Sequence, residues 1–411
     1  MSSLSAVDQL SLLHHRDFRL YWLTRISTTL AYQMMFVAVG WQIYELTGSA
    51  FNLGLVGLIL FIPALFAMLV AGHVADTYDR RRIVRWSQIG KGACAAALAL
   101  GNFTGILNAP AIFAIVFALG ACRMFDGPTM NTLIPSIVPM PMISRAVAAG
   151  TTANQMATIC GPALGGFLYV FGPAVVYTIC FGTFLLASSI VGLIHLNRPP
   201  PSEKKPVTLE SIFAGFNYMR RHPILLGAVS LDLCAVLLGG VIALLPVFAR
   251  DILETGPWGL GLLRSAPAVG AVLVSGALAH LPLQRHVGRI LTAAIIMFGL
   301  SVIAFGLSRF FLVSLAALML YGACNSLNVV VRHSLVQTRT PNDTLGRVMA
   351  VSSLFSSAAE TLGQFESGVM AALLGVVPSV LVGGAGAIGI ALLWTRLFPD
   401  LWRVQSIIPE K

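Results

Sequence analysis

Charged side chains inside long apolar stretches of this 411-residue sequence are the first candidates for chemistry, because an ionisable group is costly in a membrane interior. Arg123 and Asp126 are three residues apart, so they lie on one face of a helix. Carboxyl groups in an apolar site can bind and release protons near neutral pH, which proton-coupled movement of a solute requires. The candidates for proton coupling and charge complementarity are Arg123, Asp126, Asp232, Glu360 and Glu366.

Each of these groups also has a purely structural interpretation. Arg123 and Asp126 could neutralise each other and only hold their helix in place, and the two interpretations are about equally supported. A protonated Asp232, Glu360 or Glu366 could form hydrogen bonds between helices. We favour a functional role for Asp232 and Glu360, one of which would be the main proton carrier, over a role for Glu366.

The apolar stretches themselves predict the elements that position these groups. Hydrophobic residues make up 57% of the chain and charged residues 10%, against about 25% charged residues in a soluble protein. Runs of about 20 apolar residues can each cross a bilayer as a helix, and they lack the alternation of barrel strands. An all-α membrane protein with about twelve transmembrane helices is therefore predicted. The expected spans are 18–46, 51–74, 84–104, 110–132, 144–170, 174–196, 223–249, 258–281, 289–308, 310–333, 345–372 and 378–398.

The basic residues indicate how the chain is threaded. The net charge is +10, but Lys and Arg are spread over many loops, so no nucleic-acid surface is expected. If the N-terminus is cytoplasmic, 19 of the 26 Lys and Arg lie in cytoplasmic segments, and only Arg250 and Arg309 lie in external loops. This bias predicts a multi-pass protein of the inner membrane with both termini cytoplasmic. Residues 1–17 are polar and no cleavage site follows them, so we expect no cleaved signal peptide.

An internal repeat relates the two halves of the chain. The segment that starts at Thr132 recurs from Ser334, 202 positions later. Two pseudo-symmetric six-helix bundles are therefore expected, with a substrate site near the midplane where they meet. The expected parts are an N-terminal bundle at 1–196, a cytoplasmic linker with an interfacial helix at 197–222, and a C-terminal bundle with a cytoplasmic tail at 223–411.

The linker at 197–222 starts with a run of prolines and ends in an amphipathic pattern. A helix that floats on the inner leaflet as a connector is expected there, rather than a ligand site. Its apolar face would hold Leu209, Ile212, Phe213, Phe216 and Met219.

Two motifs carry a resemblance to the major facilitator superfamily, which extends over essentially the whole chain. The first is GHVADTYDRRR, from Gly72 to Arg82, which matches the superfamily loop G-x-x-x-D-x-x-[DG]-R-[KR]. The resemblance implies that Asp76 sits near the N-terminus of the eleventh helix, where a carboxylate is favoured, and latches one conformation. A basic loop that only sets topology is the alternative. The implied gating residues are Gly72, Asp76, Asp79, Arg80 and Arg81.

The second motif is ATICGPALGG, from Ala157 to Gly166, which resembles the exporter-type pattern G-x-x-x-G-P-x-x-G-G. Ala157 replaces the first glycine. The motif residues Gly161, Pro162, Gly165 and Gly166 would allow close helix packing and a bend. The segments at 331–350 and 360–375 are similar to the branch of the superfamily that contains the enterobactin exporter and secretion-type efflux proteins.

The resemblance also implies that the first and tenth helices line a central cavity. Polar side chains there could contact substrate, and hydrogen bonding between helices is at least as compatible with their chemistry. The cavity candidates are Arg25, Gln33, Met34, Phe36, Gln42, Tyr321, Asn325 and Asn328. No cofactor, no metal site and no phosphate-binding loop is expected from the motifs.

Together with the buried charges, the resemblance implies a secondary active exporter of a small amphiphilic compound, siderophore- or drug-like, which exchanges substrate for protons by alternating access. Its expected partners are the small-molecule substrate, protons and the lipid bilayer. It would be a monomer and would not be an enzyme. A lipid or lysolipid flippase, or a uniporter that needs no proton, would keep the architecture. A transport-dead receptor or assembly partner is the alternative of another class.

Overall fold

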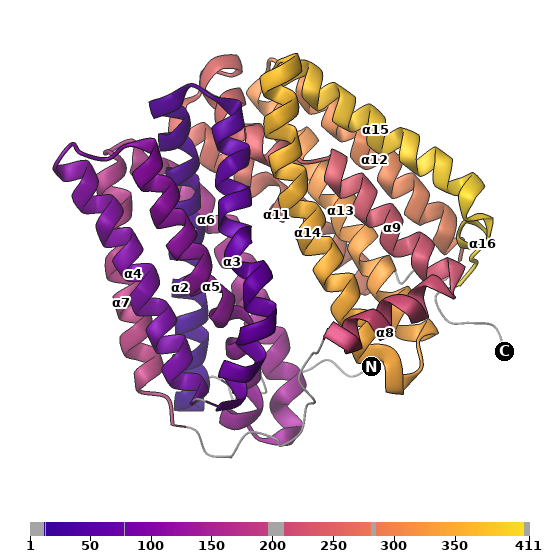
Figure 1. Ribbon diagram of the computed structural model, residues 1–411, viewed down its shortest axis with the longest axis horizontal. Helices are drawn as coiled ribbons and strands as arrows, with labels where there is room; N and C mark the ends of the chain where they lie inside the picture. Colours follow the sequence, from indigo (N-terminus) through magenta and orange to yellow (C-terminus); the bar gives the residue numbers. More distant parts are fainter. Residues whose placement is uncertain (1–11, 13, 78, 196–208, 281–284, 407–411) are drawn as a thin grey trace. The chain divides into compact units, whose positions relative to one another are not determined.

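The computed structural model describes residues 12, 14–77, 79–195, 209–280 and 285–406. Within these ranges it leaves out the side chains of 64–77, 127–128, 131, 209–212 and 342. Every element in the described part is a helix (Figure 1). The predicted all-α fold is thus confirmed.

Twelve long helical segments lie in these ranges, and each coincides with one predicted span. The first six are α2 (Arg16–Thr47), α3 (Ala50–Thr77), α4 (Arg80–Phe103), α5 (Ala109–Ile137), α6 (Ile143–Tyr169) and α7 (Pro173–Gly192). The seventh is α9 (Pro223–Leu238), continued by η2 (Val241–Leu244), α10 (Leu245–Val247) and η3 (Phe248–Ile252). The last five are α11 (Gly256–His280), α12 (Val287–Leu307), α13 (Phe311–Arg339), α14 (Asn342–Leu374) and α15 (Val376–Leu397). Three short elements complete the fold: η1 (Met140–Met142), α8 (Leu209–Arg220) and α16 (Pro399–Trp402).

The segments differ in how apolar they are. Among the described residues, seven helical segments are long and apolar enough to cross a membrane by length and composition alone, for example Pro173–Gly192 and Val287–Leu307. The helices α2 and α4 are not in that set, since polar and charged residues make both of them less apolar. A charged helix in a membrane protein must direct its charges to the protein interior or to the membrane ends.

The chain divides into two compact units. Unit 1 holds Met1–Gln42 and Ile59–Pro206, and unit 2 holds Ile43–Leu58 and Val207–Lys411. The division after Pro206 falls within the predicted linker at 197–222. The segment Ile43–Leu58 groups with unit 2, although the sequence places it among the helices of the first half.

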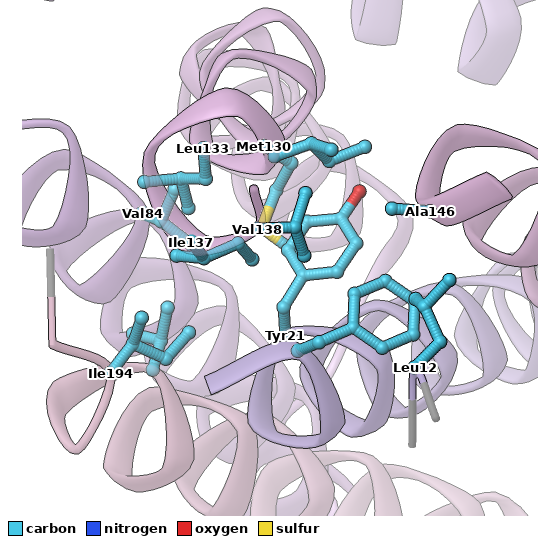
Figure 2. Close-up of a cluster of buried hydrophobic side chains, with 12 residues drawn as sticks. Leu12, Tyr21, Val84, Met130, Leu133, Ile137, Val138, Ala146 and Ile194 are labelled. Atoms are coloured by element: carbon cyan, nitrogen blue, oxygen red, sulfur yellow. The ribbon is translucent and has the colours of Figure 1, made fainter. Parts of the chain in front are cut away.

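Within unit 1, α4 packs along both α5 and α7 (Figure 1). A buried apolar cluster joins α2, α4, α5, α6 and α7, and Figure 2 shows Tyr21 with Met130, Leu133, Val138 and Ala146 around it. Tyr21 is fully buried, and its hydroxyl accepts a hydrogen bond from Arg25 Nη1 at 3.1 Å. This core therefore fixes the start of α2 and, through Tyr21, the side chain of Arg25.

Within unit 2, α11 packs along α13, α12 along α15, and α14 along α9. The predicted linker helix is present as α8. It does not simply float, because it packs against α14 (Figure 1). Met219 is fully buried there, and the rings of Phe216 and Phe355 lie 6.1 Å apart. Phe213, by contrast, is 70% exposed.

The repeat is visible in how the helices approach one another. A Cβ atom on Gly120 of α5 would collide with the Leu60 carbonyl of α3, and one on Gly322 of α13 would collide with the Pro267 carbonyl of α11. Gly322 follows Gly120 by 202 positions, the spacing of the sequence repeat. Small residues let helices approach this closely in membranes. The same interhelical contact is therefore built twice, once in each unit.

Candidate functional site

A cavity of about 250 Å³ in unit 1 gathers several of the predicted charged residues. Its walls come from α2, α4, α5 and α6. Three cationic side chains and one carboxylate face it, which makes its lining basic. The lining residues are Arg25, Thr28, Thr29, Tyr32, Gln33, Lys91, Arg123, Asp126, Met130, Asn154 and Thr158.

The carboxylate of this cavity is held by α4. Lys91 Nζ lies 2.7 Å from Asp126 Oδ2, and Gln88 Nε2 donates to Asp126 Oδ1 at 3.0 Å. The Lys91 side chain is 1% exposed, and its ammonium lies 5.5 Å from the centre of the Phe184 ring. Lys91 lies in the predicted span 84–104, but the sequence analysis gave it no role. The signal was its charge, since a cation in an apolar helix needs a partner.

Arg123, the second charged residue predicted on this helix face, has a different partner from Asp126. Arg123 donates from Nη1 to the Tyr32 hydroxyl at 2.8 Å, and its guanidinium lies 4.3 Å from the centre of that ring. Arg123 and Asp126 both line the cavity, as one helix face requires. The interpretation that they neutralise each other is wrong, because the ion partner of Asp126 is Lys91.

The exporter-type motif positions α6 against α2. Gly161, Pro162, Gly165 and Gly166 are all buried. A Cβ atom on Gly165 would lie 2.8 Å from both the Cα atom and the carbonyl oxygen of Met34, so only glycine permits this approach. Because the helices meet this closely, Gln33 of α2 and Thr158 of α6 line the same cavity.

The other candidates on α2 divide between lining and packing. Arg25 and Gln33 line the cavity, and Phe36 stacks on Tyr32 with ring centres 6.0 Å apart. Met34 is buried against α6. Gln42 is also buried, and it donates to Asn102 at 2.5 Å and accepts from the Tyr177 hydroxyl at 2.8 Å. Met34 and Gln42 thus join helices within unit 1.

Unit 2 contains a separate charged cluster around Asp232. Arg332 Nε lies 3.3 Å from Asp232 Oδ2, an ion pair without hydrogen-bond geometry. Asn328 donates to Asp232 Oδ1 at 2.6 Å, and Ser356 donates to Oδ2 at 2.9 Å. The Arg332 and Asp232 side chains are only 2% and 3% exposed. The cluster therefore links α9, α13 and α14 and is closed to solvent.

The remaining candidates of unit 2 lie apart from this cluster. Glu360 is exposed on α14, and Glu366 is partly buried. Tyr321 packs on Phe298 with ring centres 4.6 Å apart, and Asn325 is partly buried on α13. Asn328, expected to line a cavity, is instead fully buried against Asp232.

The predicted gating loop is described only in part. The side chains of Gly72 and Asp76 lie outside the described set, so the latch at Asp76 stays a prediction. The Asp79 side chain caps α4 by accepting from the Arg81 backbone amide at 2.9 Å. Arg80 Nη1 donates to the Thr132 carbonyl at 3.3 Å, and Arg81 Nη1 to the Ile194 carbonyl at 3.0 Å. These arginines therefore tie the start of α4 to the ends of α5 and α7.

The segment Ile43–Leu58 makes specific contacts within unit 2. The Tyr44 hydroxyl donates a hydrogen bond to Asp251 Oδ2, and the Arg250 guanidinium lies 5.6 Å from the centre of the Tyr44 ring. A Cβ atom on Gly54 would lie 3.1 Å from the Cα atom of Gly368. Helix α3 therefore meets α14 through glycines at this point.

The fold and the charged cavity define a multi-pass membrane transporter built from two related helical units. Residues 7–406 match the family model described as transmembrane secretion effector, so the chain belongs to that family, within the major facilitator superfamily. It is a transporter and not an enzyme. No group of three or more potential metal-binding side chains occurs among the described residues.

Individual relatives agree with this assignment. The chain is 26% identical to the enterobactin exporter EntS of Citrobacter koseri, over all of this chain and 98% of that protein. It is also 26% identical to EntS of Escherichia coli, over 100% of this chain and 99% of the relative. These similarities support a secondary exporter.

Solved structures show the same fold at lower identity. A bacterial homologue of the human lysosomal transporter Spinster superposes with a TM-score of 0.74 at 14% identity, covering 94% of this chain and 98% of that one. The nucleoside transporter NupG gives a TM-score of 0.68 at 15% identity, covering 93% and 99%. At such identities the likeness concerns the fold alone.

Proposed function

We propose that this protein exports a small amphiphilic compound with an anionic group from the cytoplasm, in exchange for protons. The observation that carries the proposal is the basic cavity of unit 1, where Arg25, Lys91 and Arg123 face a single carboxylate, Asp126. Cations that line a cavity attract an anion more strongly than cations on an open surface, because less water screens them. The Tyr32 ring and the Met130 side chain supply apolar surface beside these charges.

The sign of the electrostatics limits where the proton can bind. Protonation of Asp126 would remove the negative charge nearest Lys91 and so strengthen the binding of an anion. An exchanger needs the opposite, because proton and substrate must exclude each other. We therefore place the proton carrier in unit 2, at Asp232 or Glu360, where it acts on substrate through conformation.

Asp232 suits this role through its partners. Its protonation would weaken the pair with Arg332, which joins α9, α13 and α14. Such a buried pair is a two-state element that a proton can bias. Glu360 is the second candidate. It takes the repeat position of Thr158, which lines the unit 1 cavity.

Transport would follow alternating access, with the two halves rocking as rigid bodies. We place the protein in the inner membrane with both termini cytoplasmic, on the distribution of its Lys and Arg. The bundles expected at 1–196 and 223–411 and the gating role of Gly72 to Arg81 belong to this proposal. We expect the protein to work as a monomer.

The test uses the full-length protein in proteoliposomes with an imposed pH gradient. Because the relatives are named as enterobactin exporters, enterobactin is the first substrate to try, followed by other anionic amphiphiles. We expect substrate flux that depends on the gradient and is lost in Asp232→Asn or Glu360→Gln. Gradient-driven flux that survives in both variants would exclude these carriers.

Flux that persists without any gradient would indicate a uniporter, and movement of lipid alone would indicate a flippase. Absence of flux for all compounds, together with a block of a partner complex on deletion, would favour a receptor or assembly role.

A further inference from the structure

A second cavity, of about 470 Å³, lies in unit 2, apart from the charged cluster at Asp232. It is formed where α9 begins and α13 ends. The lining residues are His222, Pro223, Ile224, Leu225, Thr338, Arg339, Thr340 and Pro341. None of them is assigned a role in the transport cycle proposed above.

The start of α9 presents backbone donors to this cavity. The helix has 16 residues, its N-cap residue is His222, and no side chain caps it. Pro223 at the first helical position has no amide hydrogen, so the next donors are the amides of Ile224 and Leu225. The positive end of a helix dipole and free amides together favour an anion.

The end of α13 adds two polar atoms that need a partner. Thr340 is 6% exposed, and its hydroxyl has no hydrogen-bond partner within the described ranges. Arg339 Nε is also buried without a partner there, while its Nη2 donates weakly to the Ser406 carbonyl at 3.4 Å. Buried polar groups of this kind normally have a partner. Thr340 and Arg339 both line the cavity, so an acceptor bound there would supply one.

The neighbouring groups set the charge balance. Arg339 also faces an adjoining cavity of about 360 Å³, together with Arg403 and Asp400. His222 Nδ1 lies 2.8 Å from the Tyr218 carbonyl, so it donates there and the other ring nitrogen stays available. Asp400 and the last carbonyls of α13 oppose an anion, whereas the two arginines and the α9 dipole favour one.

We propose that this cavity binds a phosphate group, held by the amides at the start of α9, the Arg339 guanidinium and the Thr340 hydroxyl. Phosphate combines a negative charge with several acceptor oxygens, which matches one cation, one hydroxyl donor and two amides. The group can come from the headgroup of an anionic lipid or from a soluble phosphate.

The experiment measures binding by the purified full-length protein, after removal of lipid into a phosphate-free maltoside detergent. The unfolding temperature is followed during titration with inorganic phosphate, with dioctanoyl phosphatidylglycerol, and with chloride at matched ionic strength. We expect a saturable rise with a phosphate compound and none with chloride. Arg339→Gln and Thr340→Val should each weaken the apparent affinity about tenfold, the loss of one charge-assisted or buried hydrogen bond.

Arg220→Gln is the matched control, since it removes an exposed positive charge on α8 without altering the cavity. Arg339→Lys keeps the charge, and its affinity is measured instead if the glutamine variant fails to fold. Stabilisation by phosphatidylglycerol alone identifies a lipid headgroup, and stabilisation by inorganic phosphate identifies a soluble source. Equal effects of chloride and phosphate, or undiminished affinity in both cavity variants, would refute the site. No step of the assay depends on substrate flux, so failure here leaves the proposed export untouched.

Discussion

The two units hold their buried charges in opposite ways. In unit 1, Lys91 and Asp126 form an ion pair in the wall of a cavity, with Arg123 beside them. In unit 2, Asp232 and Arg332 form an ion pair that is almost inaccessible to solvent. Ser356 of α14 donates a hydrogen bond to Asp232. A charge beside a cavity can exchange its partner for a ligand, whereas an enclosed pair can only hold or release helices. This contrast supports our proposal that unit 1 binds the substrate and unit 2 controls the conformation.

The internal repeat makes this contrast sharper. Asp126 corresponds to Asn328 at the spacing of 202 positions, and Asn154 corresponds to Ser356. Asn328 and Ser356 both hydrogen-bond Asp232. Equivalent positions are thus polar in both units, but the carboxylate lies on α5 in one and on α9 in the other. The same helical framework thus holds an ion pair at a different place in each unit.

The largest effect should come from breaking the pair of unit 2. Arg332→Met leaves the Asp232 carboxylate buried without its cation, which costs about 3–5 kcal/mol. Lys91→Met should cost less, on the order of 1–3 kcal/mol, because Asp126 keeps Gln88 and faces the cavity. Thermal unfolding of the detergent-purified variants gives both values.

A double variant provides the control for this prediction. Adding Asp232→Asn to Arg332→Met removes the unpaired charge and should restore part of the stability. If the Arg332 and Lys91 variants lost equal stability, the distinction between an enclosed pair and a cavity pair would fail.

The next effect concerns function rather than stability. Arg123→Gln should raise the KM for efflux of an anionic substrate about tenfold, since it removes one cationic donor from the cavity. The fold should be retained, because Arg123 is exposed. Arg123→Lys keeps the charge but loses the stacking on Tyr32, so its KM should be intermediate.

Arg309→Gln, at an exposed arginine of unit 2, is the matched control and should leave KM unchanged. Efflux kinetics in proteoliposomes measure all three variants. An unchanged KM in Arg123→Gln would remove the basis for assigning substrate binding to unit 1.

The sequence predicts contacts between residues that are close along the chain better than contacts between residues that are far apart. Apolar runs predict the helices, and the small-residue motif predicts the close packing at Gly161 and Gly165, because both patterns are local. The ion pairs were missed, since Lys91 and Asp126 are 35 positions apart and Asp232 lies farther still from Arg332. The sequence shows that each buried cation needs a partner but does not say which acid supplies it.

The placement of Ile43–Leu58 in unit 2 was missed for the same reason. Periodicity assigns these residues to helices of the first half, and nothing local indicates where those helix ends pack. Their position follows from tertiary contacts such as Gly54 with Gly368 and Tyr44 with Asp251.

A smaller effect is expected from replacing a closely packed glycine in each unit, because only the one in unit 1 lies beside the cavity. Gly165→Ala would place a Cβ atom 2.8 Å from Met34, and Gly363→Ala would place one 2.6 Å from the Leu237 carbonyl oxygen. Each should cost about 1–3 kcal/mol of stability through overpacking. Only Gly165→Ala moves a wall of the unit 1 cavity, so only this variant should raise KM.

Gly182→Ala on α7 is the control, since a Cβ atom there would meet no atom within 4 Å. It should be neutral or slightly stabilising, as alanine favours helix over glycine. Unfolding temperatures measure the loss of stability in each variant, and efflux kinetics measure KM. A raised KM in Gly363→Ala would indicate substrate contacts in unit 2 as well.

The smallest effect concerns Ile43–Leu58, which belongs to unit 2 although the residues before and after it in the sequence belong to unit 1. Tyr44→Phe removes the hydroxyl that bonds Asp251 and keeps the ring beneath Arg250, so the loss should be about 0.5–1.5 kcal/mol. Hydrogen exchange at residues 43–58 should become roughly 2- to 10-fold faster, because the segment opens locally from unit 2. Tyr321→Phe removes only a weak 3.4 Å bond to the Gly239 carbonyl and should leave this exchange unchanged. If Tyr44→Phe also left the exchange unchanged, apolar and glycine packing alone would hold Ile43–Leu58 to unit 2.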